Sequence, residues 1–145
     1  MVTEHEIKRK FMQAFDCSQV VLMSAAEELG YDEEEMARMA AAFGGGMFHG
    51  DTCGCVTGAL IALGMRYGHC EADDRETKGV MMEKVKEFRE RFAGEFGTTE
   101  CRKLIGYDFS VPEEAEGAKA SGILLARCPK YAAKAAQILA EMLDE

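Results

Sequence analysis

A nearly uncharged stretch in the middle of the chain, Phe43–Met65, constrains the fold more than any other segment. It reads F-G-G-G-M-F-H-G-D-T-C-G-C-V-T-G-A-L-I-A-L-G-M, and Asp51 is its only formally charged residue. The three glycines Gly44–Gly46 favour the end of one helix and a mobile loop, because glycine tolerates backbone angles that other residues avoid. Asp51 or Thr52 can cap the helix that follows. This helix is apolar on all sides, which is typical of the interior of a bundle.

The rest of the sequence predicts an all-α fold, a compact multi-helix bundle around this buried glycine-rich central helix, in a single domain over residues 1–145. The chain has no Trp and only two Pro, and strong helix formers dominate it. A final helix is expected to begin with Cys128 as its cap and Pro129 as its first residue, where proline is well tolerated. Cap signals and apolar spacing predict the other helices over residues 3–15, 16–30, 32–43, 51–67, 73–96 and 99–105, with a further helical stretch after Ser110.

Charge and hydropathy exclude several functional classes. The net charge of −9 and the isoelectric point near 4.9 argue against nucleic acid and against an anionic membrane surface, since both require a basic face. The segment Met1–Lys10 is charged and lacks the apolar core of a signal peptide. The apolar run Val56–Met65 is about half the length of a membrane span. The expected location is therefore cytoplasmic.

The positions of the cysteines indicate thiol chemistry. Cys17, Cys53, Cys101 and Cys128 are each expected at the cap or in the first turn of a separate helix. A helix N-terminus stabilises a thiolate and can lower its pKa from about 8.5 to about 3.5–7.5. Cys53 heads the most buried helix and is the favoured thiolate, with the other three and Cys55 as disulfide partners. The predicted activity is oxidoreductase-like: reversible two-electron dithiol–disulfide exchange with a redox protein or a small thiol.

Two alternatives remain open at this point. Four thiolates from Cys17, Cys53, Cys101 and Cys128 would suit a tetrahedral zinc ion or an iron–sulfur cluster, in a protein for electron transfer or metal binding. Thiol exchange itself requires no cofactor. In the other alternative the cysteines are inert, because buried cysteine often packs as a small hydrophobe, and the bundle serves as a structural interaction domain. The glycine- and alanine-rich helix faces are also compatible with a homo-oligomer.

The remaining cysteine and the histidines carry less information. Cys70 lies just past a helix end and is interpreted as incidental. His49 precedes Cys53 by four residues and can assist a thiolate or a metal, although an exposed loop histidine is the more common case. His5 is expected to face solvent.

Several motifs together resemble one known family. The chain is similar to the redox-active protein family named for its C_GCAxxG_C_C cysteine pattern. The resemblance implies that Cys17, Cys53, Cys101 and Cys128 are the four signature cysteines of that family. At Cys55 this sequence departs from the pattern, which usually has alanine there. The segments that carry the resemblance extend over nearly the whole chain: D-C-S-Q-V-V-L (Asp16–Leu22), F-G-G-G-M (Phe43–Met47), C-G-C-V-T-G-A (Cys53–Ala59), C-R-K-L-I-G (Cys101–Gly106) and C-P-K-Y (Cys128–Tyr131).

Overall fold

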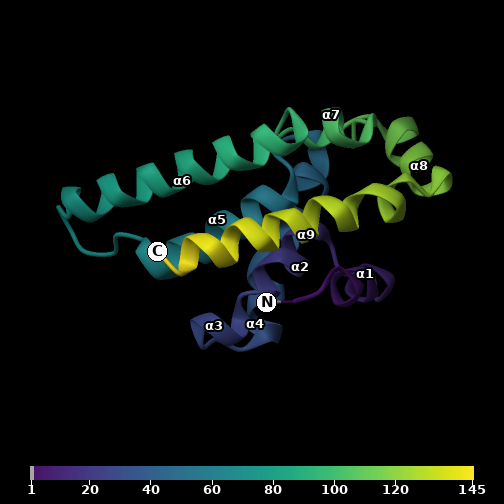
Figure 1. Cartoon of the computed structure of the whole chain (residues 1–145). Helices are drawn as coiled ribbons and strands as arrows, with labels where there is room; N and C mark the ends of the chain where they lie inside the picture. Colours follow the sequence, from purple (N-terminus) through teal and green to yellow (C-terminus); the bar gives the residue numbers. More distant parts are fainter. Residues whose placement is uncertain (1) are drawn as a thin grey trace.

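The computed structural model describes residues 2–145, and every regular element within them is a helix, as expected from the sequence (Figure 1). An isolated antiparallel bridge joins Thr52 to Glu100. None of the helices in this part of the chain combines the length and apolarity that crossing a bilayer demands. The helices are α1 (Glu4–Met12), α2 (Cys17–Met23), α3 (Ala26–Leu29), α4 (Glu33–Ala40), α5 (Gly54–Tyr67), α6 (Arg75–Phe96), α7 (Cys101–Ile105), α8 (Pro112–Ser121) and α9 (Ile123–Leu143).

Local cap chemistry explains several of these boundaries. Thr3 and Glu6 form a capping box at α1: the Thr3 hydroxyl accepts from the Glu6 N–H at 3.1 Å, and the Glu6 carboxylate accepts from the Thr3 N–H at 2.8 Å. The Asp32 carboxylate accepts from the Glu35 N–H at 3.0 Å at the start of α4. Gly97 ends α6 in a left-handed conformation with φ of 82°. These starts and stops agree with the sequence signals.

One predicted helix is two helices in the structure. Residues 16–30 divide into α2 and α3, with the break at Ser24 and Ala25. The Ser24 hydroxyl donates to the carbonyl of Val21 at 2.5 Å, and the Ala25 N–H donates to Leu22, only three residues back. A serine that bonds to its own preceding turn competes with the helical hydrogen bonds, so the chain bends there.

The predicted start of the last helix is wrong. α9 begins at Ile123, so Cys128 and Pro129 lie inside the helix and Cys128 is not a cap. Proline removes one backbone hydrogen bond from a helix interior and usually disfavours that position. Here tertiary contacts compensate, because the side chains of Arg127 and Tyr131 on either side of Pro129 both donate to the carbonyl of Leu104, at 3.2 Å and 2.8 Å.

Three other helix starts differ from the expected residue by a short distance. The caps are Cys53 at α5, Glu100 at α7 and Val111 at α8. The segment before α5 is extended and pairs with the segment before α7, which moves both helix starts toward the C-terminus. Pro112 occupies the first position of α8, where its missing N–H is not needed.

The helices pack with α5 against α2, α6 and α9, and α6 lies beside α9 (Figure 1). Arg66 is the only exposed side chain of α5. On α6, Phe88 and Phe92 are fully buried and stack with ring centroids 6.3 Å apart. They belong to the stripe that the sequence spacing predicts for this helix.

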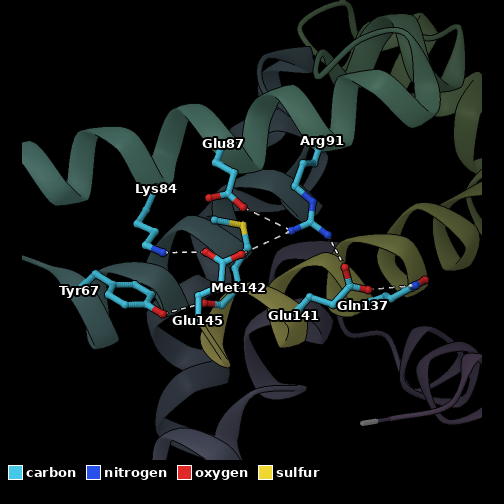
Figure 2. Close-up of polar contacts among 8 residues, drawn as sticks. All are labelled: Tyr67, Lys84, Glu87, Arg91, Gln137, Glu141, Met142 and Glu145. Carbon is cyan, nitrogen blue, oxygen red and sulfur yellow. Dashed lines mark hydrogen bonds and ion pairs between the residues drawn. The ribbon is translucent and has the colours of Figure 1, made fainter.

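Polar contacts fasten α5 and α6 to the C-terminal end of α9 (Figure 2). The Tyr67 hydroxyl donates to the carbonyl of Met142 at 2.6 Å, and Lys84 pairs with Glu145 at 2.8 Å. Arg91 pairs with Glu141 at the same place. This end of the bundle, with the C-terminus, lies opposite α7 and α8 in Figure 1, so the contacts fix the helices at a distance from the cysteines described next.

Candidate functional site

Two of the cysteines are brought together by backbone pairing between distant segments. The Cys53 N–H donates to the carbonyl of Thr99, and the Cys101 N–H donates to the carbonyl of Asp51, both at 2.7 Å. The bridge between Thr52 and Glu100 lies between these two bonds. The starts of α5 and α7 are therefore side by side, although nearly fifty residues separate them in the chain.

A third cysteine reaches the site because two glycines of α5 let α2 approach closely. A side-chain carbon at Gly54 would lie 2.4 Å from the sulfur of Cys17, and one at Gly58 would lie 2.4 Å from the carbonyl oxygen of Ser18. Real atoms do not approach so closely, so both positions require glycine as the helices are packed. The sulfur of Cys17 thus packs against Gly54, the residue that separates Cys53 from Cys55 in the sequence.

Four cysteines line one cavity of about 90 Å³: Cys17, Cys53, Cys101 and Cys128. The first and last are half-buried, whereas Cys53 and Cys101 are buried. The sequence placed these four at helix starts, and three of them do lie there, while Cys128 faces the cavity from the interior of α9. The other walls are mainly apolar and come from Phe11, Leu104, Ile105, Phe109, Leu124 and Tyr131.

Cys17 is the cysteine whose surroundings favour the thiolate. Hydrogen bonding from the thiols of Cys53 and Cys55, together with the backbone N–H groups of Gly45 and Ser18, holds the pKa of Cys17 well below its ordinary value. The sequence favoured Cys53 as the thiolate, and the structure differs: hydrogen bonding to Cys17 and burial raise the pKa of Cys53. The reason is that the donors converge on Cys17 from three separate segments, which the local position of Cys53 does not reveal.

The other thiols of the site stay protonated. Burial and the negative charge of Cys17 raise the pKa of Cys101 to about 12, and the same two causes raise the pKa of Cys128. Cys55 is fully buried within α5, and burial with hydrogen bonding to Cys17 and Cys53 raises its pKa. The site therefore combines one thiol whose pKa is lowered with several thiols whose pKa is raised.

The glycine-rich segment before α5 forms an ordered turn of unusual conformation. Gly45, Gly46, Met47 and Phe48 all have positive φ, between 54° and 62°. Glycine adopts such angles freely, but each non-glycine residue there costs about 1–2 kcal/mol. The turn is held closed by the Asp51 N–H, which donates to the carbonyl of Gly46 at 3.1 Å. It directs the N–H of Gly45 at Cys17 and leaves the side chains of Met47 and Phe48 exposed.

Two residues of the cavity were missed by the sequence reasoning. Asp16 was expected only as the first residue of the helix over residues 16–30, yet it lines the cavity, and burial together with the charge of Cys17 raises the pKa of its carboxyl group. Its position directly before Cys17 was the available signal. Tyr131 was named only as the last residue of the C-P-K-Y segment, yet it lines the cavity while its hydroxyl donates to the carbonyl of Leu104.

The candidate metal ligands of the chain are the side chains of His, Cys, Asp and Glu. Within residues 2–145, no three side chains of the types His, Cys, Asp or Glu are grouped so that they could hold a metal ion. The four thiols as placed here do not form a ready-made site for a single metal ion. His49 is exposed on the turn and does not line the cavity, His5 is exposed on α1, and Cys70 is exposed between α5 and α6.

The fold and this cavity define an all-α protein in which four cysteines line one small, mainly apolar cavity. A family model described as "Putative redox-active protein (C_GCAxxG_C_C)" matches residues 15–142. The chain belongs to this family. Neither the curated proteins nor the solved structures contain a significant match to it.

Proposed function

We propose that this protein is a thiol redox protein that cycles between a dithiol and a disulfide, with Cys17 as the nucleophile and Cys53 as its partner. The observation that carries the proposal is the contact of the Cys17 and Cys53 thiols in a shared cavity, in surroundings that lower the pKa of Cys17 and raise that of Cys53. The thiolate is the reactive form in disulfide exchange, and a second thiol at hand allows the mixed disulfide to be resolved.

The exchange would proceed in two balanced steps. The Cys17 thiolate attacks one sulfur of a partner disulfide, forming a mixed disulfide and releasing the other partner sulfur as a thiolate. Cys53 then loses its proton and attacks the sulfur of Cys17, which forms the internal disulfide and releases the second partner sulfur. The protein is oxidised by two electrons and the partner is reduced, and the reverse sequence regenerates the dithiol. A redox protein or a small thiol can serve as the partner.

Three other cysteines in or beside the cavity support this pair. Cys55 donates toward Cys17 and helps to keep it ionised. Cys101 and Cys128 are further disulfide partners within reach of the same cavity. All six thiols are free, and a reducing compartment such as the cytoplasm would keep them available for exchange.

The test is a redox titration in dithiothreitol buffers, with alkylation and intact-mass analysis at each point. The wild type should lose two thiols reversibly, and peptide mapping should place the disulfide between Cys17 and Cys53. Cys17→Ser should abolish the reversible loss, and Cys53→Ser should accumulate a mixed disulfide at Cys17. Cys70→Ser is the matched control, because this cysteine is exposed and remote from the cavity, and it should behave as the wild type. Unchanged oxidation of the Cys17→Ser protein would refute the assignment.

A further inference from the structure

We propose that the substrate that oxidises Cys17 is a small uncharged hydroperoxide, of the size of hydrogen peroxide. The inference rests on the proposed function, since it requires Cys17 and Cys53 as the redox pair, and it adds the chemical class of the oxidant. It comes from the volume of the cavity, the charge of its walls and the arrangement of the two sulfurs.

The volume of the cavity limits what can reach the sulfur of Cys17. The cavity measures about 90 Å³. This is smaller than the engineered cavity of about 150 Å³ that holds benzene in another protein, and far below the range of about 300–1,000 Å³ typical of sites for drug-sized ligands. A molecule of two oxygen atoms fits in this space. An aromatic hydroperoxide does not, unless the walls move.

The charge of the walls selects against anions. Of the described residues that line the cavity, none has a cationic side chain, and Asp16 is the one carboxylate among them. The chain as a whole carries a net charge of −9. An anionic oxidant such as glutathione disulfide would meet both the general field and the local charges of Asp16 and Cys17. Hydrogen peroxide is neutral at physiological pH and avoids this repulsion.

The two sulfurs can complete the reaction without a further group. The Cys17 thiolate attacks one oxygen of hydrogen peroxide, the O–O bond breaks, and a sulfenic acid and hydroxide form. The thiol of Cys53 then attacks the sulfenic sulfur, a disulfide forms, and water leaves with the thiol proton. In total, one thiolate, one thiol and one hydrogen peroxide give one disulfide, one water and one hydroxide, so the sulfurs lose the two electrons that the peroxide gains. The disulfide returns to the dithiol by exchange with a thiol partner.

Two neighbouring leucines of α9 provide a matched test of the size limit. Leu124 is half-buried and forms part of the cavity wall, whereas Leu125 is 44% exposed and lies outside it. We would measure the rate of Cys17–Cys53 disulfide formation with hydrogen peroxide, with cumene hydroperoxide and with glutathione disulfide, by quenching with an alkylating agent and intact-mass analysis. Trapping with dimedone in Cys53→Ser should label Cys17 as a sulfenic acid. Thermal melting would confirm that both leucine variants are folded.

In the wild type, cumene hydroperoxide and glutathione disulfide should react at least about tenfold more slowly than hydrogen peroxide, because the pocket excludes them. Leu124→Ala should raise the rate with cumene hydroperoxide several-fold relative to the rate with hydrogen peroxide, while Leu125→Ala should match the wild type in this ratio. Equal wild-type rates with all three oxidants would overturn the inference. Disulfide formation in dithiothreitol buffers without sulfenic acid at Cys17 would overturn it while leaving the proposed function intact. Absence of the disulfide with every oxidant would overturn both.

Discussion

Replacement of Gly58 by alanine tests whether the close approach of α2 and α5 builds the site. In the structure, the added methyl carbon would lie 2.4 Å from the carbonyl oxygen of Ser18 and 3.0 Å from its Cα atom. An ordinary contact between carbon and oxygen is about 3.3 Å, so the two helices must separate by about 0.9 Å to admit the methyl group. Both atoms it meets belong to the backbone, so no side-chain rotation can relieve the overlap.

The free energy of this change can be estimated by comparison with Gly64→Ala in the same helix. A methyl carbon at Gly64 meets nothing within 4 Å, so this variant should gain only the helix propensity of alanine, about 0.5–1 kcal/mol. Gly58→Ala has the same gain and adds an overpacking penalty of about 1–3 kcal/mol, with the upper end expected for a backbone overlap. The difference between the two variants is therefore the overlap itself, about 3 kcal/mol. For a chain of this length, that is about 10 °C in melting temperature.

The assay is urea and thermal unfolding followed by far-ultraviolet circular dichroism, with the pKa of Cys17 measured on the same proteins. Gly64→Ala should melt above the wild type and Gly58→Ala clearly below it. Because Ser18 follows Cys17 directly, Gly58→Ala should also move Cys17 from its donors and raise its pKa. Equal stability of the two variants, with an unchanged thiol pKa, would show that α2 and α5 do not pack through glycine and that the close approach is not what positions Cys17.

Two further predictions concern the thiols. The pKa of Cys101 is raised from 9.0 to about 12 in the folded state. Between these two pH values the folded state keeps a proton that the unfolded state loses, so the free energy of unfolding should fall by about 1.4 kcal/mol per pH unit as the pH rises. Between pH 9 and about pH 12, the urea midpoint should decline less steeply with pH for Cys101→Ala than for the wild type. Equal slopes for the two proteins would contradict a raised pKa of Cys101. Cys55→Ala introduces the residue usual in the family and removes one donor to Cys17, so the pKa of Cys17 should rise, as measured by the pH dependence of alkylation in a background without Cys70. An unchanged profile would mean that Cys55 only fills space.

The elements that could be predicted from the sequence are those whose signals are local. The capping box of Thr3 and Glu6, the cap at Asp32 and the glycine stop at Gly97 each depend on a few neighbouring residues, and each is present in the structure. The start of α9 could not be found in this way. A proline is the strongest local sign of a helix start, but contacts of Arg127 and Tyr131 with α7 keep the helix intact through it.

The sequence singled out the four cysteines that line the cavity, but not their arrangement or the other residues around them. The spacing of the cysteines identified the four that line the cavity, but the cavity itself depends on pairing between Asp51–Cys53 and Thr99–Cys101, which no local pattern indicates. The direction in which the pKa of each thiol shifts could not be predicted for the same reason. A helix start favours ionisation of whatever thiol lies there, and Cys17 and Cys53 are both at such positions. What distinguishes them is the tertiary convergence of donors on Cys17.

The glycine of the C-G-C unit follows from this convergence. A residue between two thiols at the start of a helix has no need to be glycine for the helix itself, since alanine would be the better helix former. At Gly54, however, any side chain would occupy the position of the Cys17 sulfur, which a methyl carbon would approach to 2.4 Å. Glycine leaves the space in which that sulfur lies against the helix start and receives hydrogen bonds from Cys53 and Cys55. The glycine of the motif therefore makes room for a cysteine from another helix, and the two thiols beside the glycine both form hydrogen bonds with Cys17.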